Sequence, residues 1–311
     1  MNCKTKKNSI PVIIDVDTGI DDSVAISIAA ACPKLNILLV TTSCGNVGVE
    51  QATDNVLKVL HLFGKDNIPV AKGIETNFNK NAVKAHGDDG LGNCNKLFPQ
   101  PTQQPLSDLA HVAMANAIKS SDKKVTIVAL GPLTNIAKML VEFPETKNNI
   151  DKIIVMAGSI EQYKKGELPY FGFNVKIDPA SCETVIGSGA KVVVSPCDMG
   201  HIAKLDWQDV YRTKITNMAG KMFERLFRAY KDHHVKDGIA MHDSCAVSYL
   251  IDQSIFETEY LHVFMEYYDG VGVLRCKWEE PKNIEVCTKV DIKRLKNLYF
   301  KSLKKTRTIL D

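Results

Sequence analysis

The sequence lacks a hydrophobic run long enough to cross a membrane, and it lacks a strong excess of either charge. The apolar run nearest its start, residues 10–14, is shorter than a signal-peptide core and far shorter than the roughly 20 apolar residues of a spanning helix. Lysine and arginine together number 39 against 36 acidic residues, a net charge of +3. So small a charge gives no electrostatic reason to expect nucleic acid or a membrane surface as a partner. We therefore expect neither.

Paired cysteine motifs are also absent. The nine cysteines are odd in number, scattered along the chain and include no CxxC pair. This pattern argues against a disulfide framework and against a cysteine-based zinc site. Reduced, buried thiols in a cytoplasmic protein are the simpler interpretation.

What the sequence does contain is a series of short runs rich in Val and Ile, most of them followed by a helical pattern. The runs are almost continuously apolar, as expected for strands buried on both faces of a parallel sheet. The predicted strands cover residues 12–14, 37–41, 125–129, 153–156 and 192–194, and the predicted helices cover 22–31, 49–63, 133–141 and 179–188. Repeated strand–helix units predict an α/β fold: a Rossmann-like, mostly parallel sheet flanked by helices. Ligands of such sheets bind outside the carboxyl ends of the strands.

The remaining segments do not divide the chain. Residues 77–105 read as a long polar loop, of a length that is usually functional, and 161–172 as a second loop. Residues 206–241 read as mostly helical. Further strands are predicted at 261–265, 272–275 and 285–290, before a helix at 292–303. With no repeat and no flexible linker, we predict a single domain over residues 1–311.

The stretch PVIIDVDTGIDDSVAI, residues 11–26, collects four carboxylates directly after the first predicted strand: Asp15, Asp17, Asp21 and Asp22. Like charges this close repel one another. A hard divalent cation such as Ca²⁺ or Mg²⁺ takes oxygen ligands and would cancel that repulsion. The alternative is that all four merely cap and solvate the next helix. Four carboxylates at the end of a buried strand fit that alternative poorly.

Two enzyme families have a motif like this one. The run DVDT, residues 15–18, fits the DxDxT signature of haloacid-dehalogenase-type Mg²⁺ phosphotransferases, whose first Asp is a nucleophile. The longer run DVDTGIDD, residues 15–22, more closely resembles the DxDxGxDD motif of the nucleoside hydrolases. Five later segments resemble that family in family order: TTSCGN at 41–46, AHGDDGLG at 85–92, ALGPLTNIA at 129–137, GFNVKIDPAS at 172–181 and MHDSCAVSYLID at 241–252. The phosphotransferase hypothesis explains only the first segment.

The resemblance implies hydrolysis of the N-glycosidic bond of ribonucleosides to ribose and a free base. It implies a Ca²⁺ held by Asp17, Asp22, Asp243 and the backbone carbonyl of Leu130. A water molecule beside such a cation loses its proton more easily, and Asp17 would be the general base that takes it. Nearby carboxylates would stabilise the oxocarbenium-like transition state. His242 would act on the departing base as the second catalytic residue.

The resemblance also implies a set of substrate-binding residues. Asp21 would accept hydrogen bonds from the ribose hydroxyls, Asn46 and Asn174 would contact the sugar edge, and His86 would line the base pocket. The complete predicted set is Asp21, Asn46, His86, Met156, Glu167, Asn174, Tyr230 and His242. For Tyr230, His233 and His234 a solvated helix face is an equal alternative. Asp15 is expected to support the loop from behind.

The preferred base follows from what occupies the base-binding motifs. The purine-specific branch sandwiches the base between tryptophans, one of them at the position of His242. Here the only tryptophans are Trp207 and Trp278, and neither lies in these motifs. The resemblance therefore implies the histidine-bearing branch and a preference for uridine or inosine. It also implies a homodimer or homotetramer.

The pattern departs from the family at two positions. Family members usually have Glu two residues before the Asn that matches Asn174, where it binds the ribose 5′-hydroxyl; here that residue is Gly172, and Glu167 is a candidate replacement. Ser244 replaces a Pro after Asp243. The missing Glu keeps a third possibility open beside the hydrolase and the phosphatase, namely a non-catalytic nucleoside-binding protein.

Overall fold

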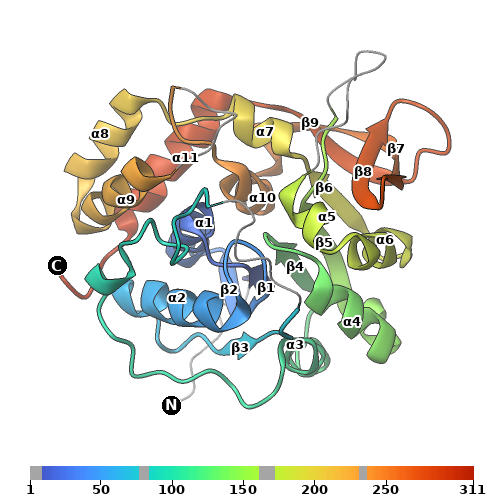
Figure 1. The fold of residues 1–311 in the computed structure, drawn as a ribbon, viewed down its shortest axis with the longest axis horizontal. Helices are drawn as coiled ribbons and strands as arrows, with labels where there is room; N and C mark the ends of the chain where they lie inside the picture. Colours follow the sequence, from blue (N-terminus) through green and yellow to red (C-terminus); the bar gives the residue numbers. More distant parts are fainter. Residues whose placement is uncertain (1–8, 77–83, 161–171, 231–236) are drawn as a thin grey trace.

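A computed structural model of the 311-residue chain describes residues 9–76, 84–160, 172–230 and 237–311. Nine strands form one sheet in the order β3-β2-β1-β4-β5-β6-β9-β7-β8 (Figure 1). Their bounds are β1 Ile10–Val16, β2 Leu35–Thr42, β3 Val70–Lys72, β4 Val125–Ala129, β5 Ile150–Met156, β6 Val192–Ser195, β7 Phe256–Tyr268, β8 Val271–Lys277 and β9 Ile284–Val290. The first seven strands in this order pair in parallel, whereas β7 is antiparallel to both β9 and β8. The predicted α/β fold with a mostly parallel sheet is confirmed.

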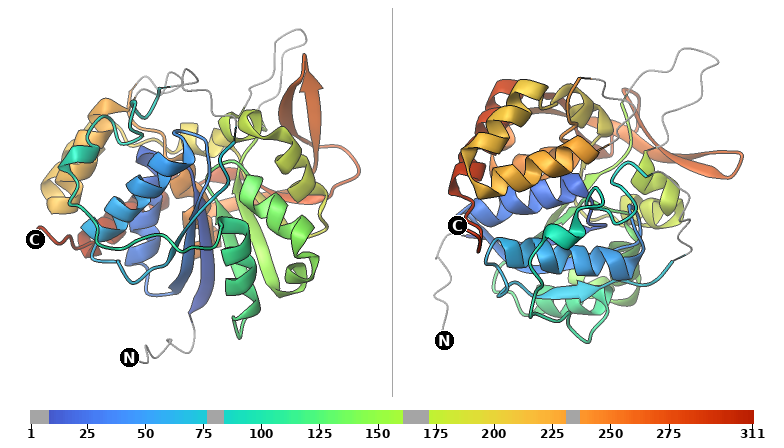
Figure 2. Two further views of the ribbon diagram at one scale, coloured as in Figure 1. Left: turned by 60° about the horizontal axis from the view of Figure 1, so that its bottom comes forward. Right: turned by 60° about the vertical axis from the view of Figure 1, so that its left-hand side comes forward.

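Helices cover both faces of the sheet (Figure 2). One face packs against α1, α2, α9, α10 and α11, and the other packs against α3, α4 and α6. The helices of the described residues are α1 Ile20–Ala31, α2 Val49–Leu62, α3 Ala110–Lys119, α4 Thr134–Glu142, α5 Phe173–Ile177, α6 Pro179–Gly187, α7 Cys197–Ile202, α8 Trp207–Thr216, α9 Met218–Ala229, α10 His242–Ile251 and α11 Ile292–Lys305, with short 3₁₀ turns at η1 Asn95–Leu97, η2 Pro144–Asn149 and η3 Gln253–Ile255.

The alternation of side chains along β1 explains why its sequence is apolar throughout. Val12, Ile14 and Val16 enter one hydrophobic core, whereas Ile13 enters the core on the other face. Successive side chains of a strand point to opposite faces, so a strand covered on both sides needs apolar residues at every position. That alternation then delivers two carboxylates, Asp15 within the strand and the next one just beyond it, into the buried carboxyl end of the sheet.

The predicted strands and helices are all present, with ends that differ by a few residues. The structure adds elements that periodicity did not reveal, among them the three-residue strand β3 at the edge of the sheet, helix α3 and the short helices α5 and α7. Residues 206–241 are helical in α8 and α9, but the described residues 237–241 are not helical. Of the predicted loop 77–105, the described part holds one 3₁₀ turn, η1. The predicted loop 161–172 lies outside the described residues except for Gly172.

The order of the strands fixes where a ligand can bind. From β1 the chain first runs outward through β2 and β3, then returns to place β4 on the other side of β1. A reversal of this kind opens a crevice at the carboxyl ends of the two central strands. Asp17 follows β1 at this point, and Leu130 follows β4.

Candidate active site

Two carboxylates, Asp15 and Asp17, fix the end of β1 and the loop that follows it. Asp15 is fully buried, and its Oδ1 accepts hydrogen bonds from the Thr41 hydroxyl (2.5 Å) and the Asn135 side-chain amide (2.9 Å). The same amide donates to the Thr42 carbonyl at 2.9 Å. Asp15 therefore joins β1 to the end of β2 and to α4. Its role in supporting the loop stays a prediction.

Asp17 lies one step nearer the crevice, and backbone surrounds it closely. The Asn46 N–H donates to Asp17 Oδ2 at 2.7 Å. A Cβ added to Gly45 would lie 2.0 Å from that oxygen, and one added to Gly131 would lie 3.1 Å from the Asp17 Cβ. Glycine at these two positions thus lets the turns after β2 and β4 approach the carboxylate. Asp17 is fixed from both neighbouring strands.

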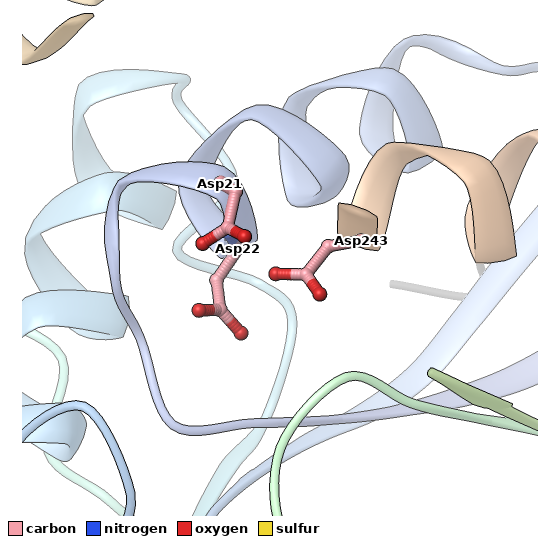
Figure 3. Close-up of side chains that lie close together, drawn as sticks. All are labelled: Asp21, Asp22 and Asp243. Atoms are coloured by element: carbon pink, nitrogen blue, oxygen red, sulfur yellow. The ribbon is translucent and has the colours of Figure 1, made fainter. Parts of the chain in front are cut away.

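A second group of carboxylates converges from two helix ends. Asp21 and Asp22 are in the first turn of α1, and Asp243 is in the first turn of α10. Figure 3 shows the three side chains facing one another, and one oxygen from each lies within 4.8 Å of the others. The positive ends of the two helix dipoles favour negative charge at these positions. The structure therefore gathers three of the predicted site residues from segments more than 200 positions apart in sequence.

Burial makes this charge cluster costly without a counter-ion. Burial raises the pKa of Asp15 to about 7. Burial and the neighbouring charges of Asp21 and Asp15 raise the pKa of Asp17 to about 7. The pKa values of Asp22 and Asp243 are raised well above the ordinary carboxyl value, mainly by burial and then by the carboxylates around them. Such groups ionise readily near neutral pH only with a compensating positive charge.

The donor set fits a hard cation. All the groups are carboxylate or carbonyl oxygens, the ligands that Ca²⁺ and Mg²⁺ prefer. Among the described residues, Asp22 Oδ1 is buried without a hydrogen-bond partner, which is the state expected of a metal ligand. The Leu130 carbonyl accepts the Asn174 side-chain amide at 2.5 Å and retains a second lone pair. The close trio differs from the predicted ligand set, because it contains Asp21 in place of Asp17; ligation by Asp17 and the Leu130 carbonyl stays a prediction.

The predicted base-pocket histidine His86 lies against the same helix end. Its Nδ1 accepts the Ile20 N–H at 3.0 Å and lies 3.7 Å from Asp21 Oδ1. Its ring packs on that of Tyr230, with centroids 4.8 Å apart. The long loop thus brings His86 and Tyr230 together beside Asp21. His233 and His234 lie outside the described residues.

His242 begins α10 next to Asp243 and is buried. Its ring meets that of His201 edge to face, with centroids 4.8 Å apart. A Cβ on Gly200 would lie 2.1 Å from His242 Nδ1, so α7 presses directly on the imidazole. His242 is held in place by a neighbouring helix.

Asn174 links the ends of β4 and β5. Its side-chain amide donates to the Met156 carbonyl at 3.0 Å as well as to the Leu130 carbonyl, and it contacts the Met156 sulfur at 3.6 Å. Asn174 and Met156 are therefore in contact, and substrate binding by both residues stays a prediction. Gly172 packs near the Gly158 backbone. Glu167, its candidate replacement for the 5′ contact, lies outside the described residues.

Sequence reasoning missed three residues of this region. Asn135 lies within the segment ALGPLTNIA, 129–137, but the sequence alone indicates no role for it. Asn55 is a polar residue on the mostly apolar buried face of α2, and that position is the available signal. His201 follows β6, so reading the residues after every strand would have found it.

A buried acidic centre at the switch point of an α/β sheet is typical of enzymes that bind a hard cation through oxygen ligands. Comparison with known proteins then gives the family. The model of the inosine-uridine preferring nucleoside hydrolase family matches residues 12–297, and the chain belongs to that family. It is accordingly a nucleoside hydrolase, an enzyme that cleaves N-glycosidic bonds, and the phosphotransferase hypothesis is wrong.

Individual relatives agree with this assignment. The non-specific ribonucleoside hydrolases RihC of Salmonella paratyphi B and Salmonella typhi are each 33% identical to this chain over 293 residues, covering 91% of this chain and 94% of theirs. Among solved structures, a purine-preferring ribonucleoside hydrolase from Gardnerella vaginalis superposes with a TM-score of 0.85 at 26% identity, covering 94% of this chain and 98% of its own. A plant nucleoside hydrolase also gives 0.85, at 25% identity, covering 95% and 99%.

Within the described ranges, every helix is too short or too polar to traverse a lipid bilayer.

Proposed function

We propose that the protein is a Ca²⁺-dependent ribonucleoside hydrolase that prefers uridine and inosine and uses Asp17 as its general base. The observation that carries the proposal is the convergence of Asp21, Asp22 and Asp243 beside Asp17 at the switch point of the sheet. A bound divalent cation would neutralise these carboxylates and lower the pKa of an adjacent water molecule. Asp22, Asp243, Asp17 and the Leu130 carbonyl would hold it.

Asp17 is suited to take a proton from the attacking water. Its Oδ2 is fixed by the Asn46 backbone, so the carboxylate has a set orientation. In the cation-free protein burial raises the pKa of Asp17 to about 7. A bound cation would lower this pKa and hold Asp17 ionised, which is the form that accepts a proton. Water deprotonated there would attack the anomeric carbon while the surrounding carboxylates stabilise the positive charge that develops on the sugar.

The ribose would lie between the carboxylate of Asp21 and the side chain of Asn174. Asp21 would accept hydrogen bonds from the ribose hydroxyl groups. Both donor contacts of the Asn174 amide are made to backbone carbonyls, which leaves the amide oxygen to accept from the sugar. Glu167 stays a proposed partner for the 5′-hydroxyl, because Gly172 has no side chain.

The leaving base would lie towards the histidines. His242, fixed by α7, would donate a proton to the base or polarise it, and His86 with Tyr230 would form the opposite wall. Histidine supplies hydrogen bonds that suit uracil and hypoxanthine carbonyls. Neither tryptophan of the chain lies in the base-binding motifs, where it could stack on a purine. The proposal extends to a cytoplasmic homodimer or homotetramer that supplies free bases and ribose for nucleoside salvage.

A turnover panel tests the proposal. Uridine, inosine, cytidine, adenosine and guanosine are each incubated with enzyme and Ca²⁺, and released reducing sugar is measured. We expect kcat/KM for uridine or inosine to exceed that for adenosine and guanosine. More efficient turnover of adenosine would contradict the base preference. Nucleoside binding without released sugar would favour the non-catalytic alternative, which the missing Glu at Gly172 makes worth testing.

A further inference from the structure

Asn55 lies on α2, away from the residues already assigned a role, and is completely buried. Its side-chain amide donates to two backbone carbonyls, that of Thr18 at 3.2 Å and that of Asp89 at 2.7 Å. Its oxygen accepts the Gln51 side-chain amide at 2.9 Å. A buried amide with its hydrogen-bonding groups engaged in this way holds its partners in a defined geometry.

The two carbonyls belong to the two loops that build the pocket. Thr18 stands between Asp17 and Gly19 with a positive φ of 22°, a backbone conformation that non-glycine residues adopt only when their surroundings impose it. Asn55 helps to hold Thr18 in this conformation, because its side-chain amide donates a hydrogen bond to the Thr18 carbonyl. The direction in which the chain turns from Asp17 into α1 therefore depends on this contact.

The other loop behaves as one unit around Asp89. The Asp89 carboxylate accepts three backbone N–H groups, those of Leu91 and Asn93 at 2.8 Å and that of Asn95 at 2.9 Å. The Gly92 N–H donates to the His86 carbonyl at 2.7 Å. Because these bonds tie residues 86–95 together, a contact that positions Asp89 also positions His86.

The loops meet closely with Asn55 between them. A Cβ on Gly90 would lie 2.8 Å from the Asn55 amide nitrogen and 3.0 Å from the Thr18 carbonyl oxygen. On the pocket side the same two loops bring His86 within 3.7 Å of Asp21. Asn55 is thus behind the pocket, at the point where the spacing of these two side chains is set.

We propose that Asn55 is a positioning residue for nucleoside binding: by joining the Thr18 and Asp89 carbonyls it sets where His86 lies relative to Asp21. The proposal rests on the proposed role of His86 in the base pocket. Without the amide, the two loops separate, and His86 no longer meets the substrate held by Asp21. The effect is expected chiefly in KM, because Asp17 keeps its own backbone contact with Asn46.

A double-mutant cycle on the Ca²⁺-loaded enzyme with uridine tests this. We expect Asn55→Ala and His86→Ala each to lower kcat/KM about tenfold, mainly through KM, and the double variant to be at most about threefold worse than the poorer single variant. The losses of kcat/KM caused by Asn55→Ala and His242→Ala should instead multiply in the double variant, because His242 is positioned by α7. Gln51→Ala is the control. Gln51 contacts Asn55 at its side-chain oxygen and not at the amide nitrogen, so kcat/KM of this variant should stay near the native value.

The outcomes distinguish a failure of the role proposed for Asn55 from a failure of the role proposed for His86. If Asn55→Ala multiplies with His86→Ala as fully as with His242→Ala, its effect is general destabilisation and the positioning role is overturned. If His86→Ala alone leaves kcat/KM unchanged, the proposed role of His86 is wrong and the inference falls with it. Asn55→Leu, which keeps the side-chain volume but has no donor, repeats the cycle should the alanine variant fail to fold.

Discussion

Asp15 lies in β1 and Asp17 lies just after its end, two positions further on, and the two carboxylates make different contacts. Asp15 Oδ1 is engaged by the Thr41 hydroxyl and the Asn135 amide, below the floor of the site. Asp17 Oδ2 is engaged by the Asn46 backbone N–H, at the edge of the crevice. The first carboxylate secures the scaffold, and the second is placed for chemistry. The difference follows from their places along the chain, because Asp15 is still inside the sheet and Asp17 lies beyond the end of β1.

At the same scale, His242 is expected to assist departure of the base. His242→Ala should lower kcat for uridine by roughly 10²–10⁴, the usual contribution of a general acid. It should leave turnover of p-nitrophenyl β-D-riboside almost unchanged, because nitrophenolate departs without being protonated. Ribose release from both substrates checks this. Equal losses on the two substrates would show that the histidine acts on the sugar or on the fold rather than on the leaving group.

At the scale of elements, α7 is a support for the start of α10. Gly200 lies against the His242 ring, and the Met241 N–H donates to the Gly200 carbonyl at 3.4 Å. The contact is too close for any side chain at position 200. The short helix after β6 therefore supports the site through the Gly200 backbone, by packing against the His242 ring and by accepting the Met241 N–H.

A matched pair of glycine variants tests that contact. Gly200→Ala places a Cβ 2.1 Å from His242 Nδ1, whereas Gly187→Ala, at the end of α6, places one with nothing within 4 Å. We expect Gly200→Ala to lose about 1–3 kcal/mol of unfolding free energy through overpacking. It should also lose far more turnover of uridine than of p-nitrophenyl β-D-riboside. Gly187→Ala should change neither. Near-native kinetics of Gly200→Ala would show that α7 does not fix the imidazole.

The sequence was most informative about elements with a clear pattern. Strand β1 and the carboxylates after it were predicted because buried parallel strands are apolar throughout and their carboxyl ends carry ligand-binding residues. Strand β3 was missed because three residues at a sheet edge have no readable period. Hydrogen-bonding residues such as Asn55 were missed because their function depends on which distant loops meet, and periodicity holds no information about such contacts.

At the scale of the whole molecule, the fold concentrates negative charge where water is excluded. Asp21 and Asp22 come from α1, and Asp243 comes from α10, two helices that pack together on one face of the sheet. Motif order predicted that these segments belong to one site. It did not predict that Asp21, Asp22 and Asp243 would form the close trio, because such spacing is set by side-chain packing.

This charge makes stability depend on pH and on a cation. Burial raises the pKa of Asp15, and burial together with neighbouring charges raises that of Asp17, from 3.8 to about 7 in the folded protein. Between pH 3.8 and about pH 7 the folded state then binds more protons than the unfolded state. The cation-free protein therefore loses stability as the pH rises through this window. A bound cation favours the ionised carboxylates and removes the loss, and protons compete with it at low pH.

We therefore expect Ca²⁺ to raise the melting temperature more at about pH 8 than at about pH 5.5. Thermal unfolding with Ca²⁺ and with chelator at each pH measures this. Asp243→Asn, which removes one charge from the trio, should shrink the difference between the two pH values. A Ca²⁺ effect of equal size at both would contradict a site made of these carboxylates.

The central claim is that Asp17 activates water for hydrolysis of a ribonucleoside. It is tested most directly by measuring ribose released from uridine by the native protein and by Asp17→Asn, with saturating Ca²⁺ and with chelator. The account predicts ribose release by the native protein that is abolished by chelator, and a fall in kcat of several orders of magnitude, roughly 10³ or more, in Asp17→Asn even when Ca²⁺ saturates. Ribose release by Asp17→Asn at close to the native rate would contradict the account.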